Sequence, residues 1–368
     1  MSAGQERHLH VMSVGISLTT NLTSGRGMYF QEGFDPGPQG RDGDYAGEMT
    51  GLFSFPYDSN PAPRTAVSEQ LTQATRAGTA MRKQLAAVLD RHRPWQRWSA
   101  GASAELTSIA AGYRRQRGDA VQLRDGDTAV LIASDTADGL RAALFNAVIL
   151  AGVQDGDTES ALDRIAYFPE PSDALFDYGG QRSVAIMRIP GMDVGDRDGF
   201  VQAMQGLGII GRGIADRIDP DPRDRAAAAD APTAVFHLSG GYKAAQPYVI
   251  GLAEALRGKT SPSRVDACVI HESSKAVEAL RVPLKSLDRE LLEAELAEIA
   301  AKEEVQDGSA FDGNGLLQLE FEAPPQTVLR GYACEPVQGP SGKWRLTPFG
   351  AALLELFRHE ITTPAPET

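Results

Sequence analysis

Short apolar runs alternate with longer stretches of helical periodicity along the first three quarters of the chain. The run HLHVMSVGISL at 8–18 is apolar on both sides of its centre, as expected of a strand buried in a parallel sheet. Strands are predicted on this basis at 8–18, 128–136, 183–191, 233–241 and 264–272.

Helical patterns fill most of the intervals between these strands. They predict helices at 68–89, 101–116, 138–152, 197–208 and 244–258. Strands that alternate with helices are typical of an α/β fold, here a Rossmann-like domain with a mainly parallel sheet over roughly 8–285. In such domains ligands bind beyond the carboxyl ends of the strands, where the strand order reverses.

Two regions depart from this alternation. Residues 24–66 hold many Gly, Pro and Asp without periodicity, which predicts a long insertion loop that is either functional or mobile. After residue 285 the pattern predicts an acidic helix at 287–304, short strands, a turn at Thr347-Pro348 and a last helix. We interpret 286–368 as a second, small α+β module of winged-helix type.

The charge of the chain is uneven. Its 36 Lys+Arg and 49 Asp+Glu give a net charge of -13, and 286–322 alone holds eleven acidic and two basic residues. The acidity argues against a protein that coats nucleic acid by charge, but says little against a small oligonucleotide in a pocket. With two cysteines, and without a long apolar run or a secretory pattern, a cytoplasmic protein with no membrane association is expected.

The strongest candidate site is Ser239-Gly240-Gly241-Tyr242-Lys243, between a predicted strand and a predicted helix. Two glycines there let the backbone approach a ligand and turn its N–H groups outward, while the helix start and the lysine add positive charge. The loop therefore suits phosphate, although the spacing of a Walker A loop is absent. The alternative is a tight turn with a solvent-exposed lysine.

Two other strand ends carry polar side chains. Gly15-Ile16-Ser17-Leu18-Thr19-Thr20-Asn21 offers hydroxyl and amide groups to sugar, base or phosphate, or else caps a helix. For Ser134-Asp135-Thr136 helix capping is the favoured interpretation. His271-Glu272, after the next strand, could form an acid–base pair, but such residues are more often structural.

Other patterns carry less weight. GLGIIG at 206–211 matches a dinucleotide-binding fingerprint, but it follows a predicted helix, so that geometry fails. The six histidines are scattered and show no zinc-binding spacing, so no metal site is predicted.

Several of these segments together resemble CARF domains, the CRISPR-associated Rossmann-like sensors. VGISLTTNL at 14–22 is similar to their first motif, and FHLSGGYKAAQPYVIGLAEAL at 236–256 is similar to their second. SAELTSI with VLIASDTADGLRAALFNAVIL, and VIHESSKAVEAL, look like the branch that contains ribonuclease effectors. The similarity covers most of 8–285, and the Gly-Gly-x-Lys motif is its most specific part.

The resemblance implies a homodimeric receptor for cyclic tetra- or hexa-adenylate, the second messenger of type III CRISPR antiviral defence. It implies no metal or other cofactor. The residues expected to contact the ligand are Gly15, Ser17, Thr19, Thr20, Asn21, Ser134, Thr136, Ser239, Gly240, Gly241, Tyr242 and Lys243.

Two functions fit this resemblance. The first is a ring nuclease, in which a ribose 2′-OH attacks the adjacent phosphate, Lys243 stabilises the charge, and Ser17 or Thr20 orients the ribose. The second is a non-catalytic sensor, regulator or effector that acts through the winged-helix-like module. The effector ribonuclease motif is missing, and the acidity of 286–322 disfavours DNA as a partner. We therefore prefer the ring nuclease.

Overall fold

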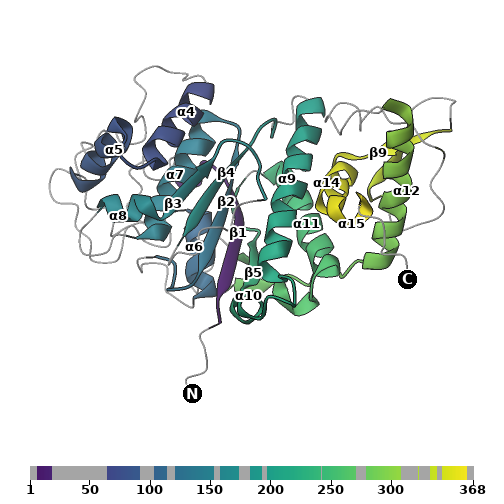
Figure 1. Cartoon of the computed structure of the whole chain (residues 1–368). Coiled ribbons are helices and arrows are strands. Elements are labelled where there is room, and N and C mark those ends of the chain that lie inside the picture. The colour runs from purple at the N-terminus through teal and green to yellow at the C-terminus, as the bar shows by residue number, and fades with distance from the viewer. Residues whose placement is uncertain are drawn as a thin grey trace.

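The computed structural model describes one large, mainly parallel sheet flanked by helices (Figure 1). The described residues are 6–18, 64–91, 103–113, 121–152, 158–173, 183–192, 197–241, 243–270, 279–307, 322, 332–337 and 342–362. The strands are β1 His8–Val14, β2 Thr128–Ser134, β3 Ile165–Phe168, β4 Val184–Ile189, β5 Thr233–His237, β6 Val265–Ile270 and β7 Ala279–Arg281. Their order is β3-β4-β2-β1-β5-β6-β7, and all neighbours pair in parallel except β6 and β7.

Helices cover both faces of this sheet. They are α4 Arg64–Thr75, α5 Ala80–Arg91, α6 Ala104–Gly112, α7 Ala137–Ala151, α8 Thr158–Asp163, α9 Arg197–Ile218, α10 Arg225–Asp230 and α11 Gln246–Lys259. Leu9 and Val11 of β1 pack in a cluster with α9 and α11, whereas Met12 and Val14 pack with α4, α6 and α7. This burial on two faces explains why β1 is apolar on both sides.

The described part of the C-terminal segment forms an outer layer on α9 and α11. It consists of α12 Arg289–Asp307, β8 Cys334–Pro336, β9 Trp344–Leu346, α14 Pro348–Leu356 and α15 Arg358–Thr362, with β8 and β9 antiparallel. Its apolar side chains, such as Leu292, Leu346 and Leu353, belong to the same cluster as those of α9 and α11. The outer layer is therefore anchored by the burial of apolar area against the sheet domain.

The glycines of 206–211 serve this packing. A Cβ added at Gly208 would lie 2.2 Å from the backbone oxygen of Ala352, and one at Gly211 would lie 2.6 Å from Leu252 Cδ1. The segment lies inside α9, so it does not form a dinucleotide-binding turn, in agreement with the sequence analysis. Its glycines instead let α14 and α11 come close to α9.

Gly208→Ala is expected to lower the free energy of unfolding by about 1–3 kcal/mol, because the methyl group would overpack the contact between α9 and α14. Gly112→Ala is the matched control, since its Cβ would meet nothing within 4 Å, and it should be neutral or raise stability by about 0.5–1 kcal/mol. Urea denaturation of both variants would measure this. Equal changes in the free energy of unfolding of the two variants would mean that the contact between α9 and α14 has room for a methyl group.

The main differences from the sequence-based expectations lie in one predicted helix that is divided, two added strands and one longer helix. The helix predicted at 68–89 is wrong as a single helix, because a turn at Gly78, with φ of +78°, separates α4 from α5. Strands β3 and β7 were not predicted, and α9 extends ten residues beyond the predicted end at 208 to Ile218. Of the insertion loop predicted at 24–66, residues 24–63 lie outside the described residues, whereas 64–66 belong to α4 and so are wrong as loop. Of the short strand predicted at 316–322, residues 316–321 lie outside the described residues.

None of the described helices combines the length and apolar character that crossing a bilayer requires. The predicted α/β fold with a mainly parallel sheet is confirmed.

Candidate functional site

The candidate site lies where the carboxyl ends of β1 and β5 meet. Met12 of β1 is in register with His237 of β5, so the loops that follow both strands begin side by side. The chain passes from β1 to β2 on one side, while β5 lies on the other. This is the point of strand-order reversal at which ligands bind in α/β sheets.

A buried carboxylate joins the two loops. Glu105, in the first turn of α6, has 1% of its surface exposed. Its Oε1 accepts hydrogen bonds from the N–H groups of Gly15 at 2.9 Å and Gly241 at 3.1 Å, and its Oε2 accepts one from Ser17 Oγ at 3.3 Å. Burial raises the pKa of Glu105, while these donors oppose that rise. The first and second motifs therefore form one unit.

The glycines of both motifs are required by this internal contact. A Cβ at Gly240 would lie 2.7 Å from Glu105 Oε1, and one at Gly15 would lie 3.2 Å from the oxygen of Gly241. Gly241 has a φ of +86°, which disfavours any other residue. From the sequence alone, the N–H groups of this loop are predicted to turn outward toward a ligand. For Gly241 the structure shows that the N–H points to Glu105 instead.

Lys243 is an exposed cation at the edge of the sheet where the carboxyl ends of β1 and β5 meet, which we call the β1–β5 rim. It begins the 3₁₀ turn η4 Lys243–Ala245, which leads directly into α11, and proline at position 247 occupies the first turn of that helix. Lys243 is thus held close to the partial positive charge of a helix N-terminus. Ser239 has a structural contact, since its Oγ accepts a hydrogen bond from Ile270 N at 2.5 Å.

At the end of β2 the polar residues cap the next helix. Thr136 Oγ1 accepts a hydrogen bond from Gly139 N at 3.0 Å, and Ser134 Oγ lies 3.1 Å from Thr136 Oγ1. Asp135 pairs with Arg188 of β4 at 2.7 Å. The capping interpretation is confirmed for Thr136, and the three residues lie at the carboxyl end of the strand that neighbours β1.

The remaining candidates lie outside the described residues. They are Thr19, Thr20, Asn21, Tyr242, His271 and Glu272.

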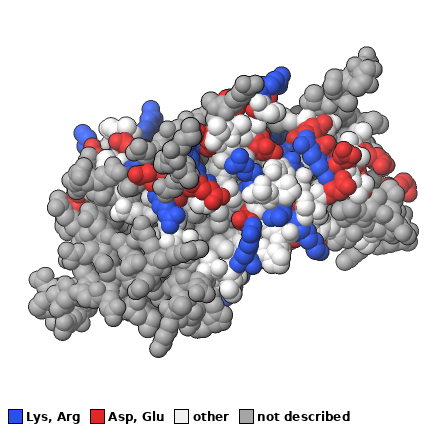
Figure 2. Space-filling model, turned by 90° about the horizontal axis from the view of Figure 1, so that it is seen from below, with Lys and Arg blue, Asp and Glu red and all other residues white. Residues whose placement is uncertain are grey.

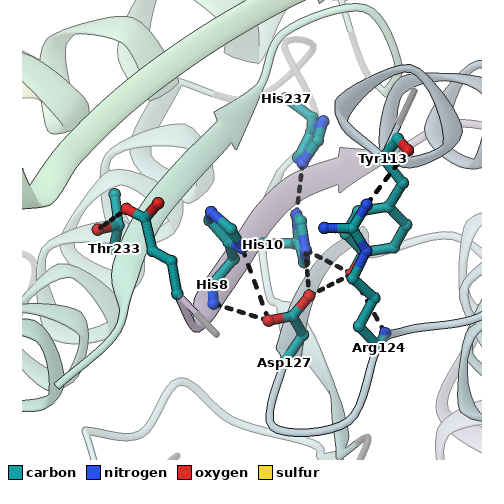
Figure 3. Close-up of polar contacts among 8 residues, drawn as sticks. His8, His10, Tyr113, Arg124, Asp127, Thr233 and His237 are labelled. Atoms are coloured by element: carbon teal, nitrogen blue, oxygen red, sulfur yellow. Dashed lines mark hydrogen bonds and ion pairs between the residues drawn. The ribbon is translucent and has the colours of Figure 1, made fainter. Parts of the chain in front are cut away.

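A second polar cluster, which the sequence analysis missed, lies under α6 (Figure 3). His10 Nδ1 lies 2.9 Å from His237 Nε2, and His10 Nε2 lies 2.9 Å from the hydroxyl of Tyr113. Tyr113 donates to Asp127 at 2.6 Å, and His237 Nδ1 lies 2.7 Å from Ser108 Oγ. We call these five residues the histidine relay. The alternation of His8 and His10 along β1 was a signal that both face one side of the sheet.

In the histidine relay each residue donates a hydrogen bond to the next, in the order Ser108, His237, His10, Tyr113 and Asp127. Tyr113 donates to the carboxylate of Asp127, and His8 Nδ1 and His10 Nε2 lie 3.6 and 3.7 Å from it. These neighbours hold the pKa of Asp127 well below its usual range, although burial opposes them. Because Tyr113 donates to this carboxylate, its oxygen accepts from His10 Nε2–H. Burial lowers the pKa of both His10 and His237, so both imidazoles are neutral. His10 Nδ1 then accepts from His237, His237 Nδ1 accepts from Ser108, and each ring has a single tautomer.

A cavity of about 210 Å³ borders the histidine relay. Its walls include His10, His237, Tyr113 and Cys268, and Arg281 and Asp266 also line it. The polar atoms of the relay are already paired with one another, so the cavity presents few open hydrogen-bonding groups. Burial raises the pKa of Cys268 to about 11, so its thiol is protonated. We interpret this cluster as structural, because it fixes α6, and with it Glu105, against β1 and β5.

In the described ranges, no group of three or more His, Cys, Asp or Glu side chains is arranged to hold a metal ion. No protein-family model matches the sequence, and no curated protein is significantly similar to it.

Proposed function

We propose that the chain binds a cyclic oligoadenylate at the β1–β5 rim and cleaves it as a ring nuclease. The observation that carries this proposal is the contact between the two motif loops, which Glu105 joins at Gly15 and Gly241. Two loops that resemble ligand-binding motifs, but lie far apart in the sequence, are thus brought to one site, with Lys243 exposed beside them.

The reaction needs a positioned ribose and a stabilised phosphate. The 2′-oxygen attacks the adjacent phosphorus and loses its proton to water, while the bond from phosphorus to the 5′-oxygen breaks and that oxygen takes up a proton. The products are a 2′,3′-cyclic phosphate and a 5′-hydroxyl. Lys243 would stabilise the extra negative charge on the phosphate, and Ser17 or Thr20 would orient the ribose.

A homodimer would complete the site by pairing two such rims around one ring. Ile16 supports this arrangement. It lies between the two Glu105-bonded residues Gly15 and Ser17, and 52% of its surface is exposed. In such a dimer the second copy would cover Ile16.

The charge of the outer layer favours cleavage over DNA-dependent regulation. Arg345 pairs with Glu335 at 2.9 Å, and Arg358 pairs with Glu355 at 2.5 Å. Seen from below, acidic side chains gather at the end of the molecule where α12 lies (Figure 2). Arg345 and Arg358, two cations that the winged-helix-like module could offer to a phosphate backbone, are therefore engaged with carboxylates. The non-catalytic sensor remains the second candidate.

The test is incubation of the purified chain with cyclic tetra- and hexa-adenylate in the presence of EDTA. We expect linear products that end in a 2′,3′-cyclic phosphate, resolved by chromatography and mass spectrometry. Stable binding without linear product would support the sensor instead. If neither ring binds, the proposal and the CARF resemblance both fail.

A further inference from the structure

Glu105 does more than hold two loops together, because its two oxygens have different partners. Oε1 takes both backbone donors, from Gly15 and Gly241, while Oε2 takes the hydroxyl of Ser17. Backbone N–H groups only donate, so Oε1 must be an acceptor in any state of the protein. Oε2 alone can change its role.

The different partners of the two Glu105 oxygens determine in which direction the hydroxyl group of Ser17 donates its hydrogen bond. Three donors surround the carboxyl group of Glu105 and both of its oxygens accept from them, so the hydroxyl hydrogen of Ser17 points inward to Oε2. The lone pairs of Ser17 Oγ are then left for the outside of the loop. Ser17 is partly exposed, so these lone pairs can reach a bound molecule.

We propose that Glu105 is a positioning residue that makes Ser17 a hydrogen-bond acceptor toward the ligand, and so selects a ring whose ribose 2′-OH can donate. This inference rests on the proposed function and specifies its substrate class. The 2′-OH groups of a ribonucleotide ring can donate the hydrogen bond that Ser17 Oγ accepts. A 2′-O-methyl ring keeps the oxygen but has no hydrogen to donate, so it leaves Ser17 unsatisfied.

Glu105→Gln exchanges the donor and acceptor roles in the hydrogen bond between residue 105 and Ser17, while the side chain at position 105 keeps nearly the same shape. The two glycine N–H groups require an oxygen at the Oε1 position, so the amide nitrogen must occupy the place of Oε2. That nitrogen donates to Ser17 Oγ, and Ser17 then turns its hydrogen toward the ligand. The variant should therefore prefer a 2′-oxygen that accepts.

The experiment measures the affinity of wild type and Glu105→Gln for cyclic tetra- and hexa-adenylate and for their 2′-O-methyl analogues. We expect wild type to prefer the ribose ring by at least about tenfold, and Glu105→Gln to lose or reverse this preference. Single-turnover cleavage of the ribose ring should fall at least about tenfold. Glu69→Gln, an exposed glutamate on α4, is the control and should match wild type.

A double-mutant cycle assigns the effect to Ser17. In a Ser17→Ala background, Glu105→Gln should no longer change the preference, because the group whose polarity it sets is absent. An unchanged preference in Glu105→Gln alone, or an equal change with and without Ser17, would overturn the proposal.

A ligand-free measurement separates this inference from the proposed function. Pairwise labelling of Val–Gly and Gly–Gly peptide units isolates the amides of Gly15 and Gly241, together with those of Gly195 and Gly180. In Glu105→Gln the signals of Gly15 and Gly241 should move together. If they do not move, Glu105 does not join the loops and the inference fails. If they move but wild type binds no ring, the proposed function fails and the ribose selection fails with it.

Discussion

Lys243→Ala is expected to slow cleavage of cyclic oligoadenylate by about 10²–10³-fold. The physical reason is the loss of the exposed cation that lies at the start of α11, next to the loop that Glu105 fixes. A preorganised positive charge at the phosphate stabilises the transition state by this order of magnitude in other enzymes. Single-turnover kinetics with the radiolabelled ring would measure the change.

Two further variants make this prediction specific. Lys83→Ala removes an exposed lysine from α5 and should leave the rate unchanged. Lys243→Arg keeps the charge but moves it, so it should retain part of the activity. A Lys243→Ala variant that cleaves as fast as wild type would show that the lysine is only a solvent-exposed residue of a tight turn.

Acidification from pH 6 to pH 5 is expected to lower the free energy of unfolding by roughly 2 kcal/mol. The cause is the histidine relay, in which burial lowers the pKa of His10 and, more strongly, that of His237. A histidine with a depressed native pKa stays neutral in the fold but binds a proton in the unfolded chain below about 6.5. Each of these two histidines therefore lowers the free energy of unfolding by up to about 1.4 kcal/mol for every pH unit of acidification in this range.

The other groups of the cluster act in different pH ranges. The carboxylate of Asp127, 3.6 Å from His8 Nδ1, raises the pKa of His8, so its stabilising contribution is complete below 6.5 and is lost as pH rises through the raised value. The depressed pKa of Asp127 means that its contribution is lost only as pH falls below about 4. Neither reverses the expected loss between pH 6 and pH 5.

Urea denaturation at a series of pH values would test this prediction. His237→Gln should lower the stability at pH 7, because it disturbs the relay, but should reduce the slope between pH 6 and pH 5 by roughly half. His359→Gln, which changes an exposed histidine, should leave the slope as in wild type. An identical slope in His237→Gln would mean that His237 is not held neutral.

Most elements of the fold could be predicted from local sequence patterns. The strands β1, β2, β4, β5 and β6 follow from apolar runs, and the cap Thr136 follows from small polar residues at a strand end. Strands β3 and β7 have only four and three residues and lie at the sheet edges, where little apolar pattern is needed. Their position is set by neighbours that are distant in the sequence.

The candidate site was predicted in part. Gly15, Ser17, Gly241 and Lys243 are found at one rim, but Glu105 entered the sequence analysis only within a predicted helix. A glutamate at the start of a helix usually faces solvent, so its pattern gave no sign of burial. Likewise, His10 and His237 are 227 residues apart and come together only because β1 pairs with β5.

The sequence by itself determined the alternation of strands and helices and the two loops whose glycines mark close approach, because these depend on residues that are neighbours along the chain. Only the tertiary structure decided what the glycines approach, which carboxylate joins the loops, and how α9 carries the outer layer. Those contacts depend on strand order and helix packing. Such long-range contacts follow from the burial of apolar surface over the whole chain and leave no local pattern.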